Sequence, residues 1–157
     1  MDLYHRILVA LDGSAGSLSA LDHAVRLAKE NRARLYVVTV ARAGPSAAEI
    51  VAASAGLGYM EPAERLEQAL RRAIATIPPD QPVTACLRVG VPADEILAVA
   101  LDERADLIVM GSRTHMPLTS VSHHVLRHSP VPVLIVQAPH EAPAAEVDET
   151  EEPAAAA

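Results

Sequence analysis

The chain has 157 residues, half of them hydrophobic, with a formal charge of -7 and a single cysteine. A chain of this length supports one domain with its own core, and a lone cysteine excludes a disulfide framework. No apolar segment approaches the ~20 residues needed to cross a bilayer, so we expect a soluble, cytoplasmic protein without a membrane partner.

The negative charge is concentrated near the end of the chain. Residues 138–157 contain six acids and no lysine or arginine, which leaves 14 acids against 13 bases in the remainder. A nearly neutral body with 2% aromatic residues lacks the cations and stacking rings that nucleic acids require, so no nucleic-acid partner is expected. We predict a domain over residues 1–138 and a disordered acidic tail, rich in Ala and Pro, over residues 139–157.

The first part of the chain predicts two strands joined by a helix. Residues 6–11 (RILVAL) are a buried strand, and the loop 12–17 leads into a helix in which apolar residues recur every three or four positions. Ser14 or Ser17 can cap the N-terminus of this helix. Residues 35–40 (LYVVTV) are the second strand. Between residues 41 and 59, glycines and prolines without a sustained period predict a long loop with a short helical turn around 47–53.

Three further strands alternate with helices in the rest of the chain. A helix with one apolar stripe begins at Pro62, the third strand covers residues 83–89, and another helix begins at Pro92. The third strand contains Cys86, which we expect to be a buried, reduced thiol. Residues 107–110 and 131–136 are apolar strands joined through a helical segment, a βαβ unit of a parallel sheet covered on both faces.

Five strands alternating with four helices predict a doubly wound α/β fold. In such sheets, ligands bind beyond the carboxyl ends of the strands, where neighbouring connections leave toward opposite faces. If the first and fourth strands are the central neighbours, loops 12–17 and 111–119 meet there. Both loops carry Gly, Ser or Thr before a helix, an arrangement that collects anions through free backbone N–H groups, although ordinary caps and turns explain it equally well.

The sequence lacks the residues of several catalytic classes. Lys29, the only lysine, lies in the first predicted helix, so there is no phosphate-loop lysine, and no G-x-G-x-x-G follows the first strand. A dinucleotide oxidoreductase is therefore disfavoured. No nucleophile has an adjacent base and no paired carboxylates occur, so we predict that the protein is not an enzyme.

Four segments in order, RILVALDGS, VGVPADEIL, DLIVMGSR and SVSHHVLRHSPVPVLIV, closely resemble the universal stress protein family over residues 4–137. The resemblance implies a five-stranded parallel sheet in the order 3-2-1-4-5, the adenine-nucleotide alpha-hydrolase-like variant of the Rossmann fold. It also implies homodimers or larger assemblies paired through the fifth strand, of which we predict the homodimer. The apolar edge of residues 133–136 independently favours such pairing, because an open apolar edge promotes aggregation.

Members of the family that bind ATP carry a motif of Gly, two residues, Gly, nine residues, then Gly and Ser or Thr. Here Gly111 matches the first glycine, but Thr114 replaces the second, Thr119 and Ser120 replace the final pair, and the loop is five residues shorter. A Cβ obstructs the backbone where it must approach a phosphate closely. The resemblance therefore implies weak or absent ATP binding and favours AMP or a smaller anion.

The adenosine half of the family's site matches better. Ala10 and Asp12 correspond to the positions that flank adenine and ribose, and Val40 to the residue whose backbone contacts adenine. Asp12 could accept from a ribose hydroxyl or cap the following turn. Together with the residues left to hold one phosphate, the predicted site comprises Ala10, Asp12, Val40, Gly111, Ser112, Arg113 and Ser120.

The histidines of the last predicted helix suggest a second kind of site. His124 and His128 are four residues apart and could present two imidazoles on one face, with His115 from the preceding loop as a third ligand. No carboxylate or cysteine is spaced in the sequence to complete a metal set, so we predict a surface histidine pair and no metal.

Two functions follow from these observations. The first is a dimeric regulatory binding module of the stress response, with weak or absent ATP binding and an unidentified regulatory protein partner. The alternative is an AMP or ATP sensor or slow ATPase, in which the loop 41–59 supplies donors for the missing glycines.

Overall fold

The computed structural model describes residues 2–44, 47–56, 62–112 and 121–138. Within these ranges the chain forms five strands and five helices. In chain order they are β1 (Arg6–Ala10), α1 (Ala15–Asn31), β2 (Arg34–Ala41), α2 (Ala47–Ser54), α3 (Pro62–Ala75), β3 (Val83–Val89), α4 (Pro92–Asp102), β4 (Leu107–Gly111), α5 (Val121–His128) and β5 (Val133–Val136). Residues 139–157, predicted as a disordered tail, lie outside the described ranges.

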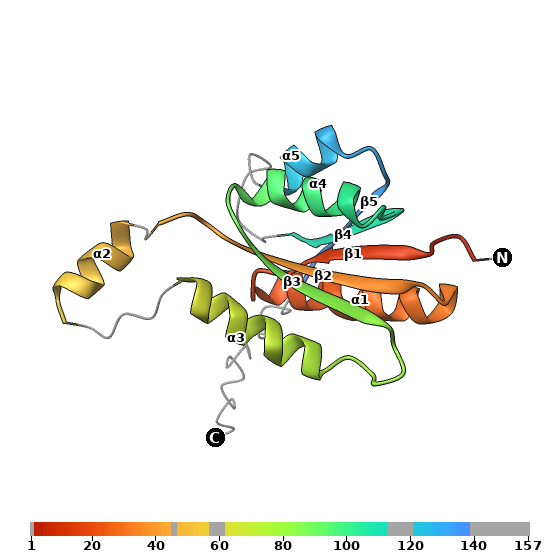
Figure 1. The fold of residues 1–157 in the computed structure, drawn as a ribbon, viewed down its shortest axis with the longest axis horizontal. Helices are drawn as coiled ribbons and strands as arrows, with labels where there is room; N and C mark the ends of the chain where they lie inside the picture. Colours follow the sequence, from red (N-terminus) through yellow and green to blue (C-terminus); the bar gives the residue numbers. More distant parts are fainter. Residues whose placement is uncertain (1, 45–46, 57–61, 113–120, 139–157) are drawn as a thin grey trace, which may run out of the picture.

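The five strands form one parallel sheet in the order β3-β2-β1-β4-β5, as predicted. Helices α1 and α3 cover one face and α4 and α5 the other, and α2 stands away from both layers (Figure 1). The central strand β1 explains the uninterrupted apolar pattern: Ile7 and Val9 pack toward α1, Leu8 packs toward α4, and none of the three is exposed.

Two predicted elements differ from the structure. Residues 47–54 form an eight-residue helix, α2, where we predicted a long loop with a short helical turn around residues 47–53, so the predicted count of four helices was wrong. Strand β5 begins at Val133 rather than at Val131, because Val131 belongs to a turn closed by Ser129. The Ser129 hydroxyl donates to the Val131 carbonyl at 2.7 Å and accepts from the Val131 N–H at 3.2 Å.

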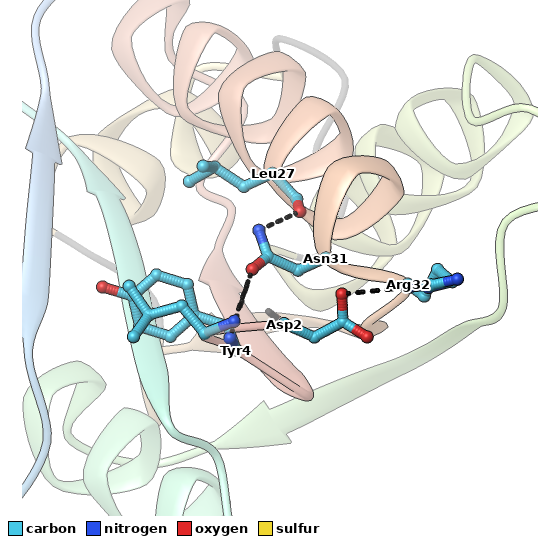
Figure 2. A network of polar contacts seen from close by, with 6 residues as sticks. Asp2, Tyr4, Leu27, Asn31 and Arg32 are labelled. Carbon is cyan, nitrogen blue, oxygen red and sulfur yellow. Dashed lines mark hydrogen bonds and ion pairs between the residues drawn. The ribbon is translucent and has the colours of Figure 1, made fainter.

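The amino edge of the sheet is fixed to the end of α1 by one side chain. Asn31 accepts through Oδ1 from the backbone N–H groups of Leu3 and Tyr4, at 2.9 and 3.3 Å. It donates through Nδ2 to the Leu27 carbonyl at 2.9 Å, and Figure 2 shows the side chain of Asn31 pointing toward Leu27. The Asn31 amide thus gives a hydrogen-bond acceptor to two backbone N–H groups that lie outside the strand ladder, and it anchors the chain where it enters β1.

Cys86 on β3 is half-buried and free of any disulfide. Burial raises the pKa of its thiol, and the neighbouring Arg88 guanidinium partly offsets this rise. A raised pKa disfavours the thiolate that a nucleophile or a metal ligand requires. None of the described helices is long and apolar enough to cross a membrane.

One buried hydroxyl has no hydrogen-bond partner in the described part of the chain. Thr39 of β2 is 1% exposed, and its Oγ1 is unpaired. It follows Val37 by two residues and therefore faces the apolar layer under α1 and α3. Burying a hydroxyl without a partner costs about 1–3 kcal/mol.

We therefore expect the nearly isosteric Thr39→Val substitution to raise the free energy of unfolding by about 1 kcal/mol, measured by urea denaturation. Thr84→Val on β3 is the matched control, because Thr84 is exposed and its hydroxyl is already hydrated. A loss of stability in Thr39→Val would mean that the hydroxyl has a partner, such as an internal water molecule.

Candidate functional site

The carboxyl ends of β1 and β4 form the centre of the candidate site. The two strands are neighbours in the sheet, β1 leads into α1 on one face, and α5, which follows β4 in the chain, lies on the other face (Figure 1). This is the topological switch point of a doubly wound sheet, where the two connections diverge and leave a crevice. The first and fourth strands are neighbours in the sheet, which is the condition under which we expected the loops after them to meet.

The loop between β1 and α1 is held by its own polar side chains. Asp12 Oδ1 accepts from the Ser14 N–H at 2.9 Å, and Ser14 Oγ accepts from the Ser17 N–H at 3.2 Å as the N-cap of α1. The Ser17 hydroxyl, 3% exposed, donates to the Ser14 carbonyl at 2.9 Å and lies 3.3 Å from the Asp12 N–H, which donates to it. The loop is thus rigid, with the Asp12 residue exposed at its start.

The sequence left two choices open in this loop, and the structure decides the first of them. Ser14, not Ser17, is the cap of α1. Asp12 caps the following turn through one carboxylate oxygen. A carboxylate has two oxygens with about four lone-pair positions, so this turn is compatible with a further hydrogen bond to a ligand.

The start of α1 lies directly against the end of β4. A Cβ added to Gly16 would fall well within 3.0 Å of the Ser112 carbonyl, and a Cβ added to Gly111 would fall equally close to backbone atoms of Gly16 and Ser17. Real Cβ atoms do not approach other atoms so closely. The two glycines therefore set the distance between the two sides of the crevice.

Of the predicted site residues, three gather at the ends of β1 and β2. Ala10 ends β1 and pairs in register with Val38, so Val40 lies two residues further along β2 toward the carboxyl edge. Ala10 and Val40 are half-buried and both contact the apolar layer under α4 and α5. Asp12 lies just beyond Ala10 and is exposed.

The phosphate side of the predicted site is described only in part. Gly111 ends β4 in register with Val136, and the Ser112 N–H donates to the Val136 carbonyl at 2.8 Å, so this backbone donor is already committed to the sheet. Arg113 and Ser120 lie outside the described residues, as does His115. The other two predicted histidines, His124 and His128, lie on α5.

Sequence reasoning missed Gly16 and Ser17 as residues that shape the site. Gly16 lies in the first turn of α1, where glycine normally only weakens a helix, so nothing in the local pattern marks it. Ser17 was considered only as a cap. Its burial follows from the contact between α1 and β4, which the sequence does not reveal.

Comparison with known proteins gives consistent matches across the domain. A model of the universal stress protein family matches residues 3–137. Universal stress protein YxiE of Bacillus subtilis is 36% identical over 154 residues, covering 86% of this chain and 100% of that protein. Universal stress protein MJ0531 of Methanocaldococcus jannaschii is 34% identical over 146 residues, covering 88% of this chain and 85% of that protein.

Solved structures agree. A universal stress protein family member from Burkholderia pseudomallei is 31% identical, with a TM-score of 0.66 over 87% of this chain and 98% of its own. A universal stress protein solved in complex with cAMP is 27% identical, with a TM-score of 0.61 over 86% of this chain and 98% of its own.

Proposed function

The chain belongs to the universal stress protein family, and from this premise we propose that it is a non-catalytic regulatory module that binds a nucleoside monophosphate in preference to ATP. The observation that carries the proposal is an asymmetry within the site. The residues that would hold an adenosine lie at the carboxyl ends of β1 and β2, whereas the glycines that ATP-binding members of the family use for the triphosphate are replaced in the sequence.

The adenosine side rests on three positions. Ala10 and Val40 present small apolar surfaces on the same face of neighbouring strands, which suits the flat face of a base. Asp12 stands exposed at the end of β1 in a rigid turn, so its carboxylate can accept from ribose hydroxyls with little ordering cost. The relative solved with cAMP, itself a nucleoside monophosphate, supports this ligand class.

The phosphate side argues against a triphosphate. Thr114 and Thr119 stand where the motif of ATP-binding members has glycine, and the segment between β4 and α5 is five residues shorter than that motif requires. Fewer backbone N–H groups are then available to neutralise the additional charges of ATP. A single phosphate needs fewer hydrogen-bond donors than a triphosphate does, so the shortened loop weakens the binding of a monophosphate less than the binding of ATP.

A variant of Asp12 tests this proposal. We expect Asp12→Ala to weaken AMP binding about 10- to 100-fold in calorimetric titration, since a hydrogen bond to a charged group contributes about 1.5–3 kcal/mol. Asp80→Ala, which removes an exposed carboxylate from a turn at the other edge of the sheet, controls for the change in net charge.

Unchanged AMP affinity in Asp12→Ala would show that the Asp12 carboxylate makes no stabilising contact with the ribose. Because the variant also loses a turn hydrogen bond, its thermal unfolding is compared with that of the wild type, and Asp12→Asn serves as a second variant that keeps the acceptor for the Ser14 N–H. Asp12→Asn should weaken AMP binding less than Asp12→Ala does.

The regulatory output of the module is proposed to depend on assembly. β5 is an edge strand, and Val133, Leu134 and Ile135 are only half-buried in the single chain. Pairing with a second copy through this edge would complete the burial of these side chains and satisfy the open backbone groups. We propose a homodimer formed in this way, which presents a surface to a regulatory protein partner.

A further inference from the structure

We propose that the carboxylate of Glu95 accepts a hydrogen bond from the exocyclic amino group of a bound adenine, and so selects adenine among the purine bases. This inference rests on the proposed function, because it assigns a base-reading residue to the same site. It is carried by the position of Glu95 over the end of β3, beside the strand ends where the adenosine would lie.

The start of α4 brings Glu95 back over the end of β3. Gly90 follows β3 directly, and its N–H donates to the carbonyl of Ala41, the last residue of β2, at 2.9 Å. A Cβ added to Gly90 would lie 2.9 Å from Glu95 Oε1 and 3.0 Å from Glu95 Cγ. The carboxylate therefore lies against the Gly90 backbone, close to the end of β2.

Glu95 belongs to the face of the sheet that carries the proposed base site. Ala10 and Val40 contact the apolar layer under α4 and α5, and Ala93, in the first turn of α4, is buried in the same layer. Glu95 lies two residues further along α4 and is half-buried. A base held against Ala10 and Val40 would thus have Glu95 on the side toward β3.

The order of the strands aligns the parts of a nucleotide along the carboxyl edge. In the order β4-β1-β2-β3, this edge presents Gly111, Asp12, Val40 and finally Glu95 over the end of β3. Neighbouring strands are about 4.8 Å apart, so β1 and β3 are separated by about 10 Å. This span is comparable with the length of a nucleoside from its sugar hydroxyls to the far edge of the base, where adenine carries its amino group.

The chemistry of a carboxylate suits this amino group. An ionised carboxylate only accepts hydrogen bonds, and a bond to a charged acceptor is stronger than one between neutral groups. Within the described residues, the Glu95 side chain has no hydrogen-bond or ion-pair partner. Guanine offers a carboxylate different donors, its N1–H and its 2-amino group, so guanosine monophosphate (GMP) is the competing ligand.

A second acidic residue of α4 separates base recognition from a purely helical role. Glu95 and Asp94 both lie in the first turn of α4, where the helix dipole favours negative charge without any ligand. Asp94, however, lies beside α5, with its Oδ1 3.5 Å from His124 Nε2. Asp94→Asn removes the same charge from the same turn and is therefore the matched control.

Calorimetric titration with AMP and with purine riboside 5′-monophosphate, which lacks the amino group, tests the proposal. The wild type should bind AMP about 10-fold or more tightly than the analogue, because the analogue leaves the carboxylate without a donor. Glu95→Ala should bind the two nucleotides with nearly equal affinity, and Asp94→Asn should keep the ratio of the wild type. Glu95→Gln, which retains a neutral acceptor, should give an intermediate ratio.

The ratio is measured within each variant, so a loss of affinity that is common to both nucleotides leaves it unchanged. Equal binding of AMP and the analogue by the wild type, a ratio retained in Glu95→Ala and Glu95→Gln, or tighter binding of GMP than of AMP would overturn this inference and leave the monophosphate site standing. If the wild type bound none of these nucleotides, the proposed function would fail, and the role of Glu95 with it.

Discussion

Gly111→Ala should lower the free energy of unfolding by about 3 kcal/mol, at the upper end of the range for overpacked positions. The new methyl group would overlap backbone atoms of Gly16 and Ser17, which cannot turn aside as a flexible side chain can. Either α1 must move away from β4 or the end of β4 must bend. Urea denaturation measures the loss, and AMP titration should show weakened binding because the crevice is displaced.

The requirement at Gly111 is one of space rather than of backbone conformation. The φ angle of Gly111 is not positive, so the backbone conformation there does not require glycine. Gly44, in contrast, has a φ of +84°, and a Cβ added there would meet only open space. Gly44→Ala is therefore the control for conformational strain alone and should lose about 1 kcal/mol. If Gly111→Ala lowered the free energy of unfolding by no more than Gly44→Ala does, the close contact between α1 and β4 would not exist in solution.

Val133→Pro should convert the proposed dimer to a monomer, raising the dimer dissociation constant about 100-fold. The carbonyls of Pro132 and Val136 accept from the β4 segment, at 3.0 Å from the Ile108 N–H and 2.8 Å from the Ser112 N–H. Because backbone groups alternate in direction along a strand, Val133 directs its N–H toward the open edge. Proline there removes a donor to the second copy and leaves the β4 ladder intact.

Ala85→Pro makes the same change on the opposite edge of the sheet. The Pro82 carbonyl accepts from the Leu35 N–H at 2.9 Å, so by the same alternation the exposed Ala85 on β3 directs its N–H away from β2. This variant should remain dimeric. Light scattering and sedimentation equilibrium measure the oligomeric state of the wild type and of both variants. A wild-type monomer at micromolar concentration, or a dimer that persists in Val133→Pro, would contradict pairing through β5.

The sheet could be predicted from sequence because its strands are buried on both faces. Apolar runs such as residues 6–11, alternating along the chain with helical segments, are typical of strands in a parallel sheet, and the glycines and prolines between them mark the connections. Helix α2 was predicted only as a short helical turn, because its residues, AAEIVAAS, are mostly apolar and form no apolar stripe, so no 3.6-residue period distinguishes the helix from a loop. Ile50 and Val51 of α2 are accordingly 54% and 68% exposed.

The candidate site was predictable to the extent that it consists of strand ends. The loops 12–17 and 111–119 follow from where the strands stop, whereas Ala10 and Val40 were added by the resemblance to the family. The structure places Ala10, Asp12, Val40 and Gly111 at the carboxyl edge of the sheet. Contacts between segments distant in sequence were not predictable. The close approach of Gly16 to Ser112, the unpaired hydroxyl of Thr39 and the carboxylate of Asp94 beside His124 depend on how helices are positioned on the sheet.

The preference for a monophosphate over ATP is the central claim, and calorimetric titration of nucleotide-stripped wild-type protein tests it most directly. AMP and ATP are each titrated with and without magnesium at the same ionic strength. We predict that AMP binds at least tenfold more tightly than ATP, which corresponds to about 1.4 kcal/mol or more. ATP binding as tight as AMP binding would contradict the claim and favour an ATP sensor or slow ATPase, and the absence of binding by either nucleotide would contradict it as well.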